Sequence, residues 1–236
     1  MASNLAYSRL TGTAGSFQDM IQRYGVVTVM NARVYDTATT LGQAPESVDT
    51  IVKKVLSYSN GVISEVSNKA PLCRLDTLKI ANATQEGPSK TITGGQYSNP
   101  LIKFGKTMRL EMQDALGNAA ALDALCGTVS ETGTVDDYET VGAVHVTEDF
   151  SGPKTIIGDT FFIDQKTGQQ VKALIVFYQF LPDSILNLTQ DAEGDAAVFD
   201  MNGDVLTTEI LIKDHSGNAV NHGVFYSILD PAELAA

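Results

Sequence analysis

The second half of the chain is a succession of short apolar runs separated by turn-type segments. From about residue 140 to residue 229 these runs are roughly 5–10 residues long and rich in β-branched and aromatic residues. Acidic and glycine-containing segments such as DAEGD (191–195) and MNGD (201–204) lie between them. Strands of this length at this spacing predict a mainly β fold, an antiparallel β-sandwich or barrel with a single flanking helix.

The clearest single strand is KTMRLEMQ (106–113), because its apolar and polar residues alternate strictly. Met108, Leu110 and Met112 fall on one face and the polar residues between them on the other. A period of two is the period of a β-strand, so one face should lie against the core and the other should meet water or polar groups.

The segment 25–70 predicts three further strands. Residues 25–40 form a long β-branched run whose alternation slips near Asn31, which is typical of a β-bulge. Asn60-Gly61 between two apolar runs is the strongest hairpin signal in the chain, with strands expected at about 50–58 and 62–67. A helix over 50–57 is the competing interpretation of the first run.

The one predicted helix is DALGNAAALDALCG (about 114–127). Asp114 can cap its N-terminus, its apolar residues from Leu116 to Cys126 follow helical spacing, and Gly127 ends it. Residues 128–139 (TVSETGTVDDYE) then read as a polar loop.

The chain is expected to form one domain preceded by an arm. Its opening residues are rich in Ser, Thr, Ala and Gly without a period, so 1–24 are predicted to be an N-terminal arm that a partner would order. Residues 25–236 show no linker strong enough to divide them. No run of 18 apolar residues or secretory signal is visible, so we expect folding in a cytoplasm and no membrane partner.

The charge is acidic and unevenly divided. The chain has 16 basic and 28 acidic residues, and residues 1–118 carry a net +3 whereas residues 119–236 carry −15. An acidic protein of this kind repels phosphate backbones, so tight nucleic-acid binding is disfavoured. The imbalance is either a solvated acidic surface or the basis of a head-to-tail self-association between a mildly basic and an acidic face.

Cys73 and Cys126 are the only cysteines, and they lack the spacing of a metal site with His145, His215 and His222. Each thiol is expected either to be a small buried apolar group or to form a disulfide, within one chain or between subunits, after the protein leaves the reducing cytoplasm.

No motif predicts catalysis or a cofactor. FGKT (104–107) lacks the preceding glycine of a phosphate loop, since Pro100 stands there, and a strand pattern follows it. The acidic groups around Asp191 and Asp200 lack the glycine and the distal glutamate of a calcium loop. An enzyme is therefore disfavoured, and no metal, cofactor or catalytic residue is expected.

The order of these segments resembles the tail tube (major tail) proteins of long-tailed bacteriophages. The likeness is carried by RVYDTATT, LDTLKIAN, KTITGGQYSNPLIKFGKTMRLEMQDALGNAAALDALCG and ALIVFYQFLPDSILNLTQDAEGDAAVFDMNGDVL, about half of the chain. The Gly94-Gly95 turn, the MQDAL strand-to-helix junction and the AEGD turn before an apolar strand are its most characteristic points.

The resemblance implies a β-barrel or sandwich with a flanking helix. In that family six subunits form a ring, and rings stack into a hollow tube through which DNA passes without sequence-specific binding. It further implies that the segment at about 38–70 reaches the next ring. The implied partners are further copies of the chain, a tape-measure protein and, if the tail contracts, a sheath. The implied location is the virion tail, assembled in the host bacterial cytoplasm.

Two other functions remain open. One is the inner tube of a contractile injection or secretion device, which would differ in what passes through the channel. The other is a monomeric β-sandwich that binds a carbohydrate or a protein.

Overall fold

The computed structural model describes residues 24–75, 79–87, 89–91, 101–103, 105–114, 119–135, 138–164, 170–183, 187–189, 198–214 and 216–234. The predicted N-terminal arm and the DAEGD turn therefore lie outside the described residues, except for Tyr24. The helical elements are α3 (Thr37–Thr40), α4 (Val48–Lys53), α5 (Ala119–Leu125) and the 3-10 turn η1 (Pro231–Leu234). The strands are β1 (Tyr24–Asp36), β2 (Leu56–Ser59), β3 (Val62–Glu65), β4 (Cys73–Leu75), β5 (Lys79–Glu86), β6 (Ser89–Thr91), β7 (Leu101–Lys103), β8 (Thr107–Asp114), β9 (Thr128–Val135), β10 (Tyr138–Val146), β11 (Lys154–Asp164), β12 (Gln170–Pro182), β13 (Asn187–Thr189), β14 (Val198–Asp200), β15 (Gly203–Leu206), β16 (Thr208–Lys213), β17 (Ala219–Val224) and β18 (Tyr226–Leu229).

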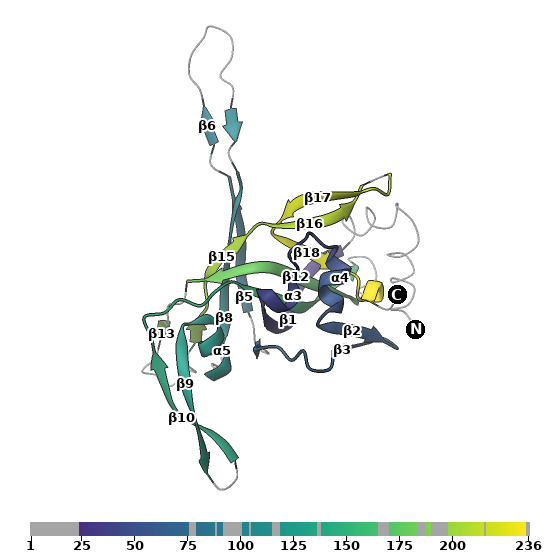
Figure 1. Cartoon of the computed structure of the whole chain (residues 1–236). Coiled ribbons are helices and arrows are strands. Elements are labelled where there is room, and N and C mark those ends of the chain that lie inside the picture. Colours follow the sequence, from purple (N-terminus) through teal and green to yellow (C-terminus); the bar gives the residue numbers. More distant parts are fainter. Residues whose placement is uncertain are drawn as a thin grey trace.

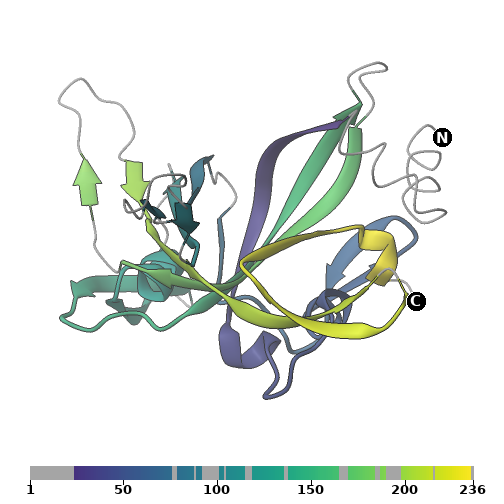
Figure 2. The ribbon, with the colours of Figure 1, turned by 90° about the horizontal axis from the view of Figure 1, so that it is seen from above.

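The fold is built on one ten-stranded sheet, and the predicted mainly β, antiparallel architecture is confirmed (Figure 1). The strands run in the order β13-β14-β8-β15-β12-β11-β1-β4, with β18 beside β12 and β5 beside β8. Figure 2 shows β1, β11 and β12 side by side as the long strands of this sheet. In the described part of the chain the path is open at β4 and β13, so the arrangement is consistent with a sandwich and is not a closed barrel.

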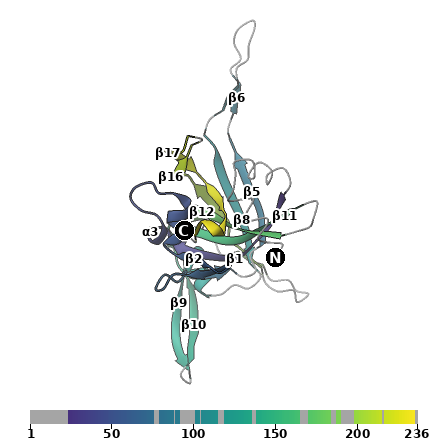
Figure 3. The same cartoon turned by 90° about the vertical axis from the view of Figure 1, so that its right-hand side faces the viewer.

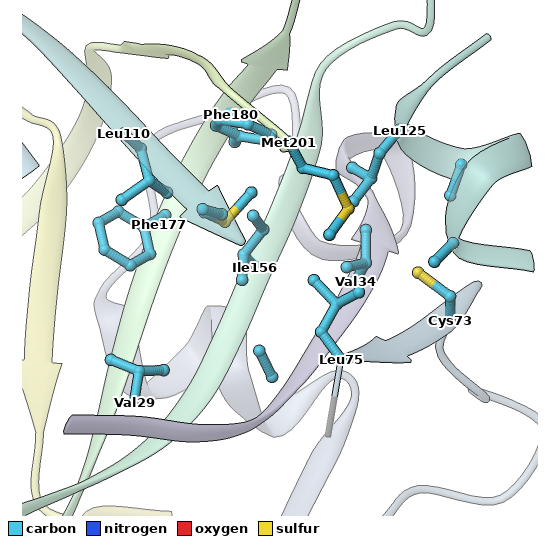
Figure 4. Close-up of a cluster of buried hydrophobic side chains, with 14 of the residues drawn as sticks. Val29, Val34, Cys73, Leu75, Leu110, Leu125, Ile156, Phe177, Phe180 and Met201 are labelled. Carbon is cyan, nitrogen blue, oxygen red and sulfur yellow. The ribbon is translucent and has the colours of Figure 1, made fainter. Parts of the chain in front are cut away.

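Hydrophobic side chains pack on both faces of β1, β11 and β12. Neighbouring residues of one strand enter different clusters: Ile156 belongs to the first core and Ile157 to the second. The first core also takes residues from β4, β8, β15 and α5 (Figure 4). The second core takes residues from α4, β2 and η1. The long strands are thus buried on both sides, between two apolar layers.

Three register shifts interrupt the pairing of these long strands, and two of them decide which core the side chains enter. Asn31 has φ 49°, and the pairing of β1 with β11 shifts between Met30 and Arg33, so the bulge predicted near Asn31 is confirmed. A second shift lies in the pairing of β12 with Lys154 and Ile156 of β11. Because of it, Phe180 packs in the first core, although Tyr178, two residues earlier on the same strand, packs in the second core. The alternating pattern of β12 did not reveal this second bulge.

Strand β8 matches its predicted alternation. Met108, Leu110 and Met112 are buried in the first core, whereas Arg109 and Glu111 are exposed. β8 lies between β5 on one side and β14 and β15 on the other. Strand β8 therefore pairs within the sheet through its backbone and packs in the first core through its apolar face.

The helix predictions need correction. Of the helix predicted over 114–127, Ala119–Leu125 form α5 and residues 115–118 lie outside the described residues, whereas Asp114, the predicted cap, ends β8 opposite Phe199. Gly127 follows the helix with φ 63°, as expected for a residue that ends one. The structure also contains α3 and α4, so a single flanking helix is wrong.

The strand expected at about 50–58 is wrong over its first half, where the competing helical interpretation is correct. Ile51, Val52, Val55 and Leu56 are all buried, and this spacing also fits one face of a helix followed by a strand. The Asn60-Gly61 hairpin is confirmed: both residues have positive φ, 52° and 80°, as a two-residue turn between β2 and β3 requires.

The segment 38–70 lies against the body through α4 and β2, which contribute to the second core. That it reaches a neighbouring ring stays a prediction. The elements that extend farthest from the body are instead β5 to β8 at one end and β9 and β10 at the other (Figures 1 and 3).

Gly203 is expected to tolerate no side chain. It is buried where β15 lies between β12 and β8, and a Cβ there would be 2.3 Å from the Leu181 carbonyl oxygen and 2.7 Å from the Phe180 ring. Gly203→Ala should therefore lower the free energy of unfolding by about 2–3 kcal/mol. Gly223→Ala on β17 is the matched control, because its nearest atom would be 4.0 Å away, and denaturant unfolding compares the two. Equal effects would contradict the close packing at Gly203.

Tyr35 and Tyr178 are buried phenols with opposite hydrogen-bonding states. Tyr178 donates to Ser227 Oγ at 2.6 Å, whereas the Tyr35 hydroxyl has no partner among the described residues. Tyr35→Phe should therefore raise the free energy of unfolding by about 1 kcal/mol, and Tyr178→Phe should lower it by a similar amount. Urea unfolding at pH 7 checks both signs.

The same two residues predict a loss of stability at high pH. Burial, and for Tyr35 also the charge of Glu65, raises the pKa of each phenol to about 12. Each phenol makes its full contribution to stability below its unfolded-state pKa near 10. That contribution is lost as the pH rises through the folded-state pKa of about 12. Tyr35→Phe should reduce this alkaline loss.

Candidate functional site

The two cysteines lie in the first core. Cys73 is on β4 and Cys126 directly follows α5; both are buried, and no disulfide joins them (Figure 4). Burial raises the pKa of the Cys126 thiol to about 11, so this thiol stays protonated and poorly reactive near neutral pH. A disulfide between subunits, the alternative left open by the sequence, would require a thiol to leave the core. We expect assembled particles to migrate identically on reducing and non-reducing gels, whereas a dimer band seen only without reductant would establish the cross-link.

The other sequence candidates are not brought together. His145 on β10 lies 3.2 Å from Glu131 Oε1 on β9, His222 lies exposed on β17, and His215 is outside the described residues. Lys106 and Thr107 lead into β8, as expected for a strand rather than a phosphate loop. Within the described ranges, no cluster of three metal-ligating side chains occurs, and no helix is long and apolar enough to cross a membrane.

The strongest electrostatic feature is a buried guanidinium on β1. Arg33 donates to Asp159 on β11, with Nη1 3.0 Å from Oδ1 and Nη2 3.4 Å from Oδ2. Asn31 donates to the same carboxylate at 3.0 Å, and Glu65 lies 3.8 Å from Arg33 Nε and 2.6 Å from Arg74. Sequence reasoning missed this cluster.

This charged cluster joins the β2–β3 hairpin to the sheet. Glu65 ends β3, while Arg33 and Asp159 lie on neighbouring sheet strands. A cavity of about 320 Å³ beside it is lined by the charged residues Arg33, Asp159 and Lys172 and by apolar residues that include Val62 and Phe161. Because the carboxylates here already face guanidinium groups, the geometry serves to anchor the hairpin rather than to present a catalytic base.

One end of the molecule is a long antiparallel arm, formed by β5 to β8 and called here the long arm. β5 and β8 pair from Lys79 opposite Gln113 to Glu86 opposite Thr107, and β6 and β7 continue the ribbon outward. Arg109 braces its base, contacting Asp183 and, at 3.5 Å, Asp204 on β15. The outer part extends beyond the body in two perpendicular views (Figures 1 and 3).

The opposite end is a second ribbon, formed by β9, β10 and the following residues 147–150 and called here the acidic hairpin. β9 and β10 pair only with each other among the described strands. Asp123 of α5 fixes its base by accepting hydrogen bonds from Thr128 Oγ1 at 2.6 Å and from the amide and hydroxyl of Ser130, both at 3.1 Å. The residues interpreted from sequence as a polar loop are thus largely a strand.

Among the described strands, β6 with β7 at the outer part of the long arm and β9 with β10 pair only within their own ribbons. A two-stranded ribbon is marginally stable in water, and its outer strands leave backbone groups open to further pairing. β16 and β17 also form a two-stranded ribbon with Ile212 and Val220 exposed, although Ile210 of β16 is bridged to Glu46 and packs in the second core. The signal in the sequence was the excess of polar and acidic residues over 128–139, where only Val129, Val135 and Tyr138 are large and apolar or aromatic. No protein-family model matches the chain, and no curated protein matches it.

Proposed function

We propose that the protein is the tail tube protein of a long-tailed bacteriophage. Six copies form a ring, and rings stack into a hollow conduit through which DNA leaves the virion. The sequence resemblance suggests this function, and the mainly antiparallel β fold agrees with it.

The observation that carries the proposal is the pair of ribbons at opposite ends of the body. The long arm and the acidic hairpin are different surfaces pointing in opposite directions (Figures 1 and 3). Contacts between two different surfaces of identical subunits are head-to-tail and produce rings or open-ended polymers rather than closed dimers. Projecting ribbons of this kind suit a subunit that contacts copies above and below it.

The charge of the chain suits a conduit for DNA. The net charge of −12 disfavours retention of a phosphate backbone, so DNA could slide through a channel lined by acidic and neutral polar residues. We expect the lumen to be lined mainly by Asp, Glu, Asn, Gln, Ser and Thr. A structure of the assembled tube with a basic lumen would contradict this part of the proposal.

The partners follow from the same proposal. The chain would contact itself within and between rings, a tape-measure protein inside the growing tube and, in a contractile tail, a sheath. Its location would be the virion tail.

Negative-stain electron microscopy over a concentration series, with light scattering in parallel, tests the proposal. Rings or hollow tubes with a central channel are the expected result. A monodisperse monomer at high concentration would count against it and would favour a monomeric binding module. Co-purification with a tape measure and capsid proteins, rather than with secretion components, separates a phage tail from an injection device.

A further inference from the structure

The dipeptide Asn-Gly occurs twice in the chain, and the structure places its two copies in opposite environments. Asn60 and Gly61 form the turn of the β2–β3 hairpin, where both residues are exposed and have φ 52° and 80°. Asn202 and Gly203 lead into β15, where Asn202 is partly buried and Gly203 is buried in the sheet. The same two residues are therefore open to water at one site and enclosed at the other.

Asn-Gly is a chemically labile dipeptide, because glycine has no Cβ to shield its backbone nitrogen from the preceding side chain. The glycine nitrogen bonds to Cγ of the asparagine, and the side-chain nitrogen leaves as ammonia with the proton that the glycine nitrogen loses. This step closes a five-membered cyclic imide. Water then breaks one of the two carbonyl–nitrogen bonds of the ring, so that the asparagine becomes aspartate or isoaspartate. Water is the only co-reactant.

We propose that Asn60 is a site of spontaneous deamidation in the folded protein, and that Asn202 is protected from the same reaction. The Gly61 amide makes no hydrogen bond within the described part of the chain, so its nitrogen is available to react. Apart from its chain neighbours, no atom lies within 4 Å of the position that a Cβ of Gly61 would take. This inference does not depend on the proposed tube.

The tip of the β2–β3 hairpin can open without disturbing the sheet. The cyclic imide holds the backbone in a conformation other than that of a two-residue turn, so the turn must open before the ring can form. Among the described strands, β2 and β3 pair only with each other, from Leu56 opposite Glu65 to Ser59 opposite Val62. Residues 59–62 are all exposed. Local opening of such a tip costs much less free energy than global unfolding.

The turn at Asn202 cannot open alone. Gly203 lies opposite Pro182 of β12 and Leu110 of β8, so its backbone is held between two strands. The Asn202 carbonyl oxygen also accepts a hydrogen bond from the Asp183 amide at 2.8 Å. Opening this turn would separate strands that cover the first core, which requires most of the free energy of unfolding.

Modification of Asn60 also reaches the charged cluster around Arg33. Isoaspartate adds one methylene group to the backbone of a turn whose length of two residues sets the register of β2 and β3. Glu65, which lies 2.6 Å from Arg74 and 3.8 Å from Arg33 Nε, ends β3. A change of register would therefore displace the carboxylate that joins the hairpin to the sheet.

Peptide mapping by mass spectrometry of the full chain, aged in mildly alkaline buffer at physiological temperature, tests the proposal. In the folded protein, replacement of NH₂ by OH at position 60 should be at least about tenfold faster than at position 202. In urea, which unfolds both turns, the two positions should react at similar rates, because the dipeptide is the same. Equal rates in the folded protein, or a slower reaction at position 60, would overturn the proposal.

The Asn60→Asp variant is the matched control for the effect on the hairpin, since it adds the charge without the methylene group. It should melt within about 1 °C of the wild type, whereas the isoaspartate form, separated by ion exchange and identified by peptide mapping, should melt about 2–4 °C lower. Equal melting temperatures of the variant and the isoaspartate form would overturn the link to the charged cluster.

Discussion

Leu110→Asp is expected to abolish folding. Leu110 is fully buried on β8 in the first core, opposite Gly203 of β15 and Ala83 of β5. An aspartate there would be a charge without a partner in an apolar layer, and such changes cost more than about 4 kcal/mol. A loss of this size approaches the roughly 5 kcal/mol at the lower end of domain stabilities, so the variant should be insoluble or lack a cooperative thermal transition by circular dichroism.

Leu110→Met is the matched control for this position. It keeps the volume and the apolar character, so the free energy of unfolding should fall by less than about 1.5 kcal/mol. A soluble Leu110→Asp protein that unfolds cooperatively near the wild-type temperature would contradict the placement of β8 against the core.

Arg33→Met is expected to have the second largest effect. The Arg33 side chain is only 6% exposed, and its removal leaves the Asp159 carboxylate at the sheet surface without its guanidinium. Removal of one partner from a buried ion pair costs about 3–5 kcal/mol, and the partial exposure of Asp159 places the expected loss at about 3 kcal/mol. Urea denaturation measures this loss.

Two further variants separate burial from charge pairing. Arg109 also contacts two carboxylates, but its side chain is 44% exposed, so Arg109→Met should cost less than about 1 kcal/mol. Adding Asp159→Asn to Arg33→Met should cost less than the two single changes together, because the uncompensated charge is removed. Equal losses at Arg33 and Arg109 would rule out a special contribution of the buried pair.

The sequence correctly predicted the elements that are determined by residues adjacent to one another in the chain. The alternation of Met108, Leu110 and Met112 appears as a strand with one buried face because the period of two needs no knowledge of the neighbours. Asn60-Gly61 predicts its turn for the same reason: both residues readily adopt the positive φ that the turn requires.

The features that were missed depend on distant neighbours. The run around Ile51 fits both a strand and a short helix, and its packing in the second core decides in favour of the helix α4. The first strand of the acidic hairpin, β9, carries only two large apolar residues, Val129 and Val135, so hydrophobic periodicity did not reveal it. Arg33 gives no local signal of its role, because its carboxylate partner Asp159 lies 126 residues later.

The position of β1 in the sheet has a consequence for how the protein is made. Asp36 at the end of β1 is linked to Lys154 of β11, 118 residues later, and β12 follows only after that. At about 5–20 residues per second, a ribosome needs roughly 6–25 s to synthesise the partner that β1 requires. During that interval β1 can pair only with β4, which covers Ala32 to Val34, and the strand edge that β11 occupies stays open. Folding of the sheet, and with it any contact between copies, must therefore wait until most of the chain has been translated.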